Sequence, residues 1–245
     1  MSGHAHITDL LESAVRNNAE WCQVIARAHG LPGRFEEGLW VHPEPMPPFY
    51  PNAVTLPSSL VARQQARLAS LVAGVGGLLS VKDSFCCLDL QPLGFRPLFK
   101  AEWIFRPPYD ASGLLSGNCR RIVGEDEVCQ WELAWGQTPP GVGRIFPADL
   151  LANPDVAMIA IFDRDEIVAG CIGNSAHGVV GWSNVFGSLP DVCLAALTNE
   201  FPELPIVDYE READLLMAKS LGFKAIGELQ IWTRDESTGG GKSYT

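Results

Sequence analysis

Three β-rich runs follow one another in the second half of the chain, and only short turns separate them. They cover Val156 to Phe162, Ile167 to Gly173 and Gly178 to Phe186. Runs of this kind joined by tight turns predict an antiparallel meander at the centre of a sheet. The next segments predict a helix, a buried strand and a second helix that ends at a glycine, at 191–199, 204–207 and 212–220. This order predicts an α/β fold with a mixed sheet.

Part of the sequence occurs twice. Residues 93–106 begin with Leu-Gly-Phe and lead through an aromatic, apolar stretch to an arginine, and residues 221–234 repeat that order. In both copies we expect Leu-Gly-Phe to close a helix, with Gly94 and Gly222 as left-handed caps before a long strand. Duplication explains the repeat, and chance similarity over so few residues is the alternative. A Pro- and Gly-rich stretch at 107–117 then predicts an N-terminal half, a C-terminal domain and a flexible tail, at 1–110, 111–236 and 237–245.

The first half is less regular. Its N-terminal segment has the apolar spacing of an amphipathic helix, with Asp9 and Glu12 as the expected capping pair and Gly30 as the stop. Two strand-like segments, 38–41 and 50–56, enclose a cluster of prolines that we expect to prevent regular pairing between them. No meander is recognisable in this half.

Composition narrows the class of partner. The chain has 245 residues, 47% apolar and 19% charged, which provides ample material for a core. Its net charge of −11 argues against nucleic acid and anionic membranes as partners, whereas a cationic amine is compatible. No apolar run reaches the ~18–20 residues that cross a bilayer and no signal peptide is recognisable, so we expect a cytoplasmic protein. The seven cysteines form no C-x-x-C pair, and no metal site is expected.

The order of elements, together with the ending Ala218-Lys219-Ser220-Leu221-Gly222-Phe223-Lys224-Ala225-Ile226-Gly227, resembles the GNAT superfamily of acyl-CoA-dependent N-acetyltransferases. The resemblance covers residues 119–234, and residues 1–106 look like a shortened second copy. It implies a GNAT-like acyl-CoA N-acyltransferase fold, partially duplicated in a tandem arrangement. It also implies an enzyme that transfers an acyl group from acetyl-CoA or another acyl-CoA to an amine of a small polar acceptor by direct attack.

The resemblance also assigns a cofactor site. In the family the fourth strand splays from the fifth, and the freed backbone groups hydrogen-bond the pantetheine arm while the next helix N-terminus holds the pyrophosphate. These positions fall on six consecutive residues, Asn184, Val185, Phe186, Gly187, Ser188 and Leu189. The family's glycine-rich pyrophosphate loop is absent here, and Ala218 stands where a tyrosine commonly acts as the acid. A catalytically degenerate protein that binds a small ligand or a protein partner is therefore the alternative.

Candidate site residues lie at two places. Tyr209 and Asp208 are the catalytic candidates and Glu210 a substrate-binding one, because they follow the strand 204–207 at the edge where α/β sheets gather ligands. The alternative for these three is a solvated turn whose acids cap the next helix.

The second group of candidate site residues consists of Trp131 and Trp135. They stand four residues apart, and they either line an acceptor pocket or belong to the core. The oligomeric state is open, and a homodimer is one option.

Overall fold

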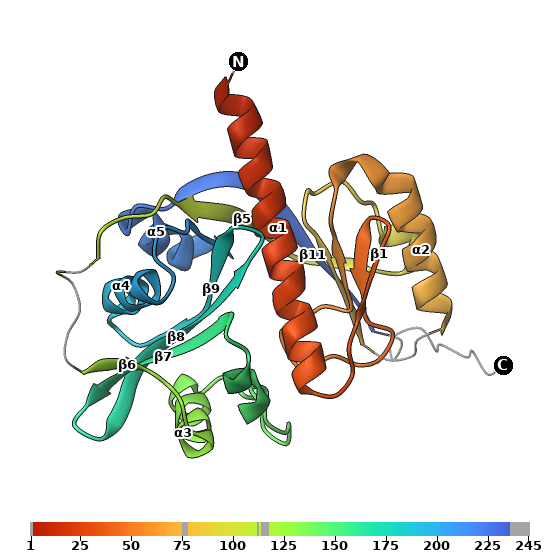
Figure 1. Ribbon diagram of the computed structural model, residues 1–245. Helices are drawn as coiled ribbons and strands as arrows, with labels where there is room; N and C mark the ends of the chain where they lie inside the picture. Colours follow the sequence, from red (N-terminus) through yellow and green to blue (C-terminus); the bar gives the residue numbers. More distant parts are fainter. Residues whose placement is uncertain (1, 75–77, 112, 114–117, 236–245) are drawn as a thin grey trace.

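The computed structural model describes residues 2–74, 78–111, 113 and 118–235, which form five α-helices, three short 3₁₀ helices and eleven strands (Figure 1). The helices are α1 (Ser2–Ala28), α2 (Val61–Gly74), α3 (Glu125–Trp135), α4 (Pro190–Glu200) and α5 (Glu212–Ser220), with 3₁₀ turns η1 (Ser58–Leu60), η2 (Gln91–Leu93) and η3 (Ala148–Ala152). The strands are β1 (Arg34–Glu36), β2 (Leu39–Val41), β3 (Ala53–Thr55), β4 (Leu79–Asp83), β5 (Arg96–Arg106), β6 (Cys119–Arg121), β7 (Val156–Asp163), β8 (Glu166–Ala176), β9 (Val179–Phe186), β10 (Ile206–Glu210) and β11 (Lys224–Arg234). None of these helices is both long and apolar enough to span a lipid bilayer.

All the strands belong to one mixed sheet in the order β1-β2-β3-β4-β11-β5-β10-β9-β8-β7-β6. The predicted meander is confirmed, because β7, β8 and β9 pair antiparallel in sequence order. Strand β10 runs parallel to β9, and β5 lies between β10 and β11. A strand from the first half of the chain is therefore inserted between two strands of the second half.

The N-terminal strands differ from the expectation. Strands β1, β2 and β3 form an antiparallel meander, and β4 runs parallel to β3. The prediction that prolines prevent pairing was wrong: Leu39 pairs with Thr55 and Val41 with Ala53. The prolines lie in the connection between β2 and β3, so none removes a donor from the ladder itself.

Both Leu-Gly-Phe segments end a helical turn and start a long strand, as predicted. Gly94 has φ +81° and Gly222 has φ +89°, the left-handed conformation of a helix cap. Each donates its backbone N–H three residues back, Gly94 to Gln91 and Gly222 to Lys219. The first copy has only the 3₁₀ turn η2 where the second has helix α5.

Helix α1 crosses the middle of the molecule between the parts that carry α2 and α4 (Figure 1). It ends before Gly30 as expected, but it begins at Ser2, so Asp9 and Glu12 lie inside the helix and do not cap it. The cap prediction failed because an earlier helical turn precedes these residues.

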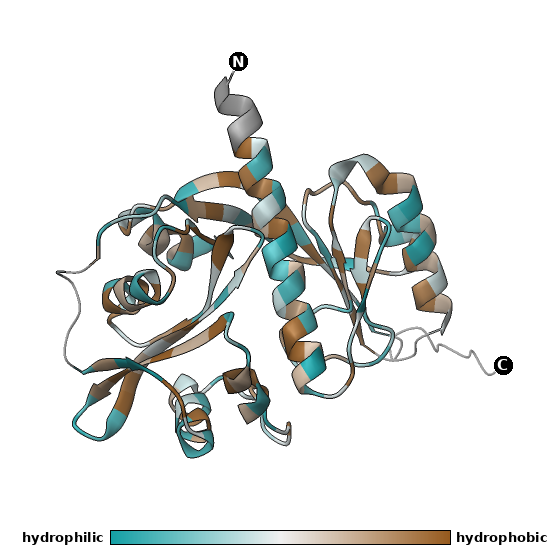
Figure 2. Ribbon diagram, in the orientation of Figure 1, coloured by the Kyte–Doolittle hydropathy of each residue, from teal (hydrophilic) through white to brown (hydrophobic). Residues whose placement is uncertain are grey.

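The core is divided by the sheet. Helices α4 and α5 cover one face of the C-terminal strands, and α1 and α3 cover the other, while α2 packs on the N-terminal strands. Hydrophobic residues run along the strands, and α1 and α2 carry hydrophobic and hydrophilic residues along their length (Figure 2). On the face that α4 and α5 cover, the fully buried Trp182 stacks on Phe223, with ring centroids 5.2 Å apart. In β9, Val180 and Trp182 pack on the α4–α5 side of the sheet and Val179 on the α1 side, and burial on both faces fixes the register of this strand.

Candidate functional site

Strands β9 and β10 separate soon after they meet. Their ladder holds two pairs, Val180 with Ile206 and Gly181 with Val207, and no further pair joins them in the described part of the chain. The outer edge of β10 remains paired with β5 as far as Glu210, and β9 remains paired with β8. The backbone groups that face each other beyond Gly181 therefore have no partner strand, and a polar chain inserted there would satisfy them.

A bulge in β9 widens the separation. The register against β8 shifts between the pairs Gly170–Phe186 and Ile172–Ser183, and Asn184 inside the bulge has φ +54°. Bulges bend the strand that contains them and occur often beside functional sites. Just beyond it, Gly187 has φ +82°, and a Cβ there would lie 2.3 Å from the carbonyl oxygen of Val168. Glycine is required at that position for β9 to leave the sheet by this path.

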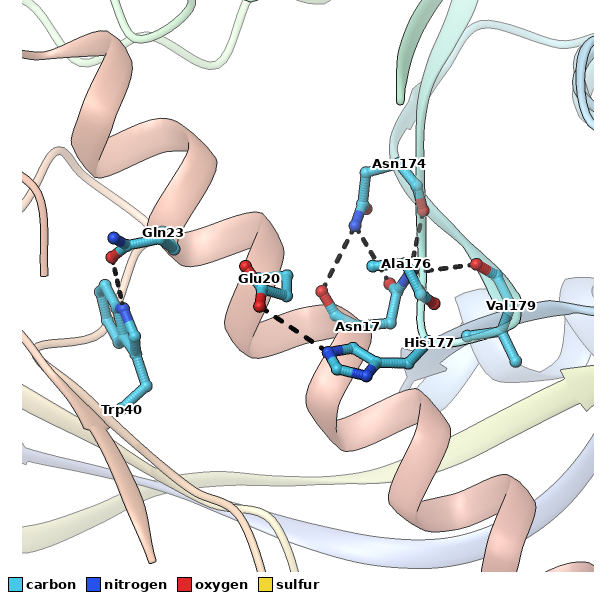
Figure 3. Close-up of polar contacts among 8 residues, drawn as sticks. All are labelled: Asn17, Glu20, Gln23, Trp40, Asn174, Ala176, His177 and Val179. Carbon is cyan, nitrogen blue, oxygen red and sulfur yellow. Dashed lines mark hydrogen bonds and ion pairs between the residues drawn. The ribbon is translucent and has the colours of Figure 1, made fainter. Parts of the chain in front are cut away.

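Helix α1 is fixed against the start of the separation (Figure 3). The buried Asn17 donates through Nδ2 to the carbonyl of Asn174 at 2.9 Å and to those of Ala176 and Val179 at 3.3 Å. The Asn174 amide donates back to Asn17 Oδ1 at 3.2 Å. A Cβ on Gly181 would lie 2.4 Å from Asn17 Oδ1, so the absence of a side chain admits this contact. These hydrogen bonds hold α1 over the point where β9 and β10 separate.

Two more polar contacts connect the same helix to both parts of the chain (Figure 3). Glu20 lies 3.7 Å from Nε2 of His177 in the β8–β9 turn, and Gln23 accepts a 2.8 Å hydrogen bond from the indole of Trp40 in β2. Helix α1 is therefore bonded to the second half of the chain and to the N-terminal meander at once.

A cavity of about 280 Å³ occupies the separation. Its wall combines α1, the loop before β3, β4, the end of α3, the β9 bulge and β10. The lining residues are Asn18, Trp21, Cys22, Phe49, Tyr50, Pro51, Lys82, Trp135, Gln137, Ser183, Asn184, Val185, Asp208, Tyr209 and Glu210.

Two carboxyl groups share one side of the cavity. Asp208 and Glu210 stand two residues apart on β10 and so project to the same side. Burial and the neighbouring charge of Glu210 hold the pKa of Asp208 well above its usual range. Burial, followed by the charge of Asp214, raises the pKa of Glu210 to about 7. The pair therefore retains a proton near neutral pH and exchanges it there, which suits a general acid or base.

The alternative in which these acids form a solvated turn was wrong. Asp208 and Glu210 lie within β10 and line the cavity, and neither caps α5, whose N-cap is Arg211. Tyr209 lines the cavity as well. Its ring meets Trp103 edge-on, at 5.4 Å between centroids, and the ammonium of Lys82 lies 4.0 Å from its centroid.

The first half of the chain supplies wall residues that sequence reasoning missed. Lys82 in β4 is only 3% exposed, and its ammonium donates a 2.6 Å hydrogen bond to Oδ1 of Asn18 in α1. A lysine inside a short apolar strand was the signal that could have found it, because lysine is rarely buried without a role. Tyr50 comes from the proline-rich loop, and no sequence pattern marked it.

Two polar atoms on the wall lack partners. The buried hydroxyl of Tyr50 and the buried indole N–H of Trp135 make no hydrogen bond with any residue that the structure describes. Burial raises the pKa of Tyr50 well above its usual range, so this hydroxyl keeps its proton. Orphaned buried donors beside a cavity indicate a place where a bound molecule accepts hydrogen bonds.

The residues expected to hold a cofactor divide into two groups. Asn184 and Val185 line the cavity, as the expected strand edge requires. The ring of Phe186 packs instead against Trp131 in the core, with centroids 5.0 Å apart. Gly187, Ser188 and Leu189 form the connection to α4 and do not line this cavity.

The two tryptophans proposed for substrate binding have different surroundings. Trp135 lines the cavity, but Trp131 is fully buried, and its indole donates a 2.8 Å hydrogen bond to the carbonyl of Ile159. Trp131 therefore belongs to the core. The prediction treated both alike because helical spacing places them on one face, whereas only the last turn of α3 reaches the opening.

The start of α4 is a poor cradle for a pyrophosphate. Pro190 at the first helical position has no N–H to donate, and Asp191 adds a negative charge to the first turn. The strand edges beyond the β9–β10 ladder are open to an extended polar chain, whereas this helix N-terminus does not fit the phosphates that the resemblance predicted there. Among the described residues no three His, Cys, Asp or Glu side chains gather as a metal site does.

The corresponding place in the N-terminal strands is closed. Strands β3 and β4 pair in parallel as β9 and β10 do, but beyond the ladder the Ser84 N–H donates to Oγ1 of Thr55 at 2.8 Å. The carbonyl of Ser84 accepts a 2.9 Å hydrogen bond from the indole of Trp103. Side chains satisfy this backbone, whereas that of β10 faces a cavity.

Comparison with known proteins agrees with the architecture. No protein-family model and no curated protein sequence matches the chain. Among solved structures it is similar to a putative acetyltransferase from the GNAT family of Novosphingobium aromaticivorans, with a TM-score of 0.55 and 14% identity over 88% of this chain and 96% of that one. It is also similar to a GCN5-related N-acetyltransferase from Kribbella flavida, with a TM-score of 0.56 and 13% identity over 90% and 95%. Saccharomyces cerevisiae N-myristoyltransferase, crystallised with myristoyl-CoA and inhibitors, gives a TM-score of 0.50 and 8% identity over 74% and 59%.

Identities this low are informative about the fold alone. The mixed α/β architecture of the chain matches that of these structures, as the sequence predicted. The protein has the fold of the GNAT superfamily.

Proposed function

We propose that the protein is an acyltransferase that moves an acyl group from acyl-CoA to the amine of a small polar acceptor in the cavity between β9 and β10. The observation that carries this proposal is the end of the β9–β10 ladder at Gly181 and Val207, with a cavity of about 280 Å³ beyond it. The GNAT-like solved structures support the same chemistry through their fold.

The thioester arm fits the strand edges. A pantetheine chain is extended and carries two amide groups, so it hydrogen-bonds to unpaired backbone as another strand does. The bulge at Asn184 and the neighbouring Val185 face the cavity and are the β9 positions that we assign to this contact. The acyl end then lies near Tyr209 and the carboxyl pair.

The transfer needs one proton acceptor and one donor. The amine nitrogen attacks the thioester carbonyl carbon, a C–N bond forms, and the C–S bond breaks with its electron pair going to sulfur. We assign the amine proton to the Asp208–Glu210 pair, in which the pKa of Glu210 is about 7. Tyr209 is the candidate that returns a proton to the thiolate.

The cavity favours a small acceptor. Its volume admits a molecule of a few heavy atoms beside the acyl group, and its carboxyl groups suit an amine. The net charge of −11 also favours an amine over an anion during approach.

A second candidate is a protein that binds a ligand in this cavity without turnover. Pro190 and Asp191 at the start of α4 favour it, because they weaken the phosphate contact on which tight acyl-CoA binding depends. This candidate shares the cavity with the first and differs in having no thiol product.

We also propose that the chain consists of two related halves, 1–110 and 111–236. In each half an antiparallel meander leads to a parallel strand, β4 or β10. The last strand of each half pairs antiparallel with the parallel strand of the other, β5 with β10 and β11 with β4. This exchanged arrangement supports duplication with shared strands over a chance repeat.

Calorimetry with acetyl-CoA, followed by detection of free thiol with a panel of amines, tests the function. We expect binding and amine-dependent thiol release, with release greatly slowed in Asp208→Asn and Tyr209→Phe. The matched control is Glu166→Gln, because Glu166 is exposed on β8 and does not line the cavity. No heat at millimolar acetyl-CoA would refute the proposal, and binding without thiol release from any amine would support the second candidate.

A further inference from the structure

The cavity contains a buried positive charge that the protein itself does not neutralise. Lys82 is 3% exposed and points its ammonium to Asn18 at 2.6 Å and over the Tyr209 ring at 4.0 Å. No carboxylate among the described residues lies within ion-pair distance of it. An amide oxygen and an aromatic face stabilise an ammonium but leave its charge uncompensated.

Asp208 does not fully neutralise the charge of Lys82. Asp208 is close enough to interact electrostatically with Lys82, but burial and Glu210 raise its pKa well above the usual range. The carboxyl pair therefore retains a proton near neutral pH, and at most part of one negative charge faces Lys82. A buried charge without a full partner is costly, and an anionic group of a ligand removes that cost.

The Tyr50 hydroxyl is another donor on the same cavity wall. The Asn184 and Trp21 side chains lie near the Tyr50 hydroxyl, but neither makes a hydrogen bond of standard geometry with it, and burial raises its pKa so that it keeps its proton. Lys82 and Tyr50 together offer donors to an oxygen anion. The pair Asp208–Glu210 on β10 offers acceptors to an ammonium group. The lining of one cavity of about 280 Å³ thus combines a buried ammonium group with a pair of carboxyl groups.

We propose that the acceptor is a small zwitterion, an amino acid or a related amino carboxylate, with its carboxylate bound by Lys82 and its amine directed to Asp208 and Glu210. This inference rests on the proposed acyl transfer and specifies its acceptor. Lys82 acts as a specificity-determining residue, since it binds the part of the acceptor that does not react.

The test compares three matched ligands on wild-type protein: amino acids, their carboxamides, and primary amines of the same side chain. Thiol release with acetyl-CoA and calorimetry without acetyl-CoA are measured for each. We expect the free acids to be preferred over the carboxamides by about tenfold or more in both measurements, because the amide loses a charge-assisted hydrogen bond.

Substitution of Lys82 gives the second arm. In Lys82→Met we expect the preference for free acids to disappear while acetyl-CoA affinity changes by less than about threefold. Lys224→Met is the matched control, because Lys224 is exposed on β11 and does not line the cavity. Tyr50→Phe keeps the ring and is expected to reduce the preference by about threefold or more. Tyr50→Phe tests the same acceptor preference if Lys82→Met fails to fold.

The outcomes separate the two proposals. Equal use of acids and carboxamides by a protein that binds acetyl-CoA and releases thiol overturns the zwitterion and leaves the acyl transfer intact. If acetyl-CoA does not bind, calorimetry with the acceptors alone still decides: Lys82-dependent affinity for amino acids supports the zwitterion site, and no such affinity overturns it.

Discussion

Replacing Glu210 by glutamine is expected to make the protein more stable at alkaline pH. Glutamine has nearly the same shape but cannot ionise. The native state raises the pKa of Glu210 from 4.5 to about 7, so it disfavours the charged form relative to the unfolded chain. The stability that Glu210 contributes is therefore full below about pH 4.5, falls as the pH rises towards 7, and stays low above it.

The magnitude follows from the same two pKa values. A pKa shift of one unit corresponds to about 1.4 kcal/mol, so the shift of the Glu210 pKa from 4.5 to about 7 corresponds to about 3 kcal/mol. Glu210 borders an open cavity and shares its proton with Asp208, and screening by solvent reduces the effect. We expect Glu210→Gln to gain about 1 to 2 kcal/mol over the wild type between pH 5 and pH 8.

Urea denaturation of both proteins at pH 5, 6, 7 and 8 measures this gain as the change in their stability difference with pH. Taking the difference cancels the titrating groups that do not interact with Glu210, and it retains the part of the Asp208 titration that depends on Glu210. Glu166→Gln, an exposed carboxyl on β8, serves as the matched control and is expected to give a difference that does not change with pH. A Glu210→Gln curve parallel to that of the wild type would refute the assignment of a raised pKa to this carboxyl.

Three further predictions concern the site and its support. The catalytic efficiency of the wild type should rise with pH and level off above about 7, because Glu210 must lose its proton before the pair accepts one from the amine, and a flat profile would contradict this role. Asn17→Ala should lower the free energy of unfolding, measured in urea, by about 2 kcal/mol, because three carbonyls of the β8–β9 region lose their donor. A loss below about 0.5 kcal/mol would contradict the role of Asn17 in holding α1 against these strands. Trp131→Phe should lower the free energy of unfolding by about 1 to 3 kcal/mol and leave the acceptor KM unchanged, because the Trp131 indole donates a hydrogen bond in the core. Trp135→Phe should change the acceptor KM with a smaller loss of stability, because Trp135 lines the cavity and its indole has no hydrogen bond among the described residues. The reverse pattern would contradict this division.

The parts of the fold that the sequence predicted are those with local signals. Three β-rich runs separated by short turns predicted the meander β7–β9, and Leu-Gly-Phe predicted the left-handed caps at Gly94 and Gly222. Helix α5 and the end of α1 also follow from periodicity and glycine. Each of these depends on residues within a few positions along the chain, where propensity and hydrogen bonding decide the conformation.

The failures have a different physical origin. Pairing of β2 with β3 depends on the return of a loop, and pairing of β5 with both β10 and β11 joins residues that lie 100 or more positions apart in the chain. No local pattern encodes such contacts. The same reason hid Lys82 and Tyr50, because only the assembled sheet and α1 bring them to the cavity.

The exchange of strands also changes what the first half of the chain contributes. If residues 1–110 only covered a complete C-terminal domain, the cavity wall would come from residues beyond 110. Instead β5 forms the paired edge that holds β10 in place, and β4 and α1 supply Lys82 and Asn18. In the N-terminal strands Thr55 and Trp103 hydrogen-bond the Ser84 backbone beyond the β3–β4 ladder, so no opening forms there. One half thus keeps its strands joined and contributes its side chains to the opening in the other, so the site belongs to the sheet as a whole.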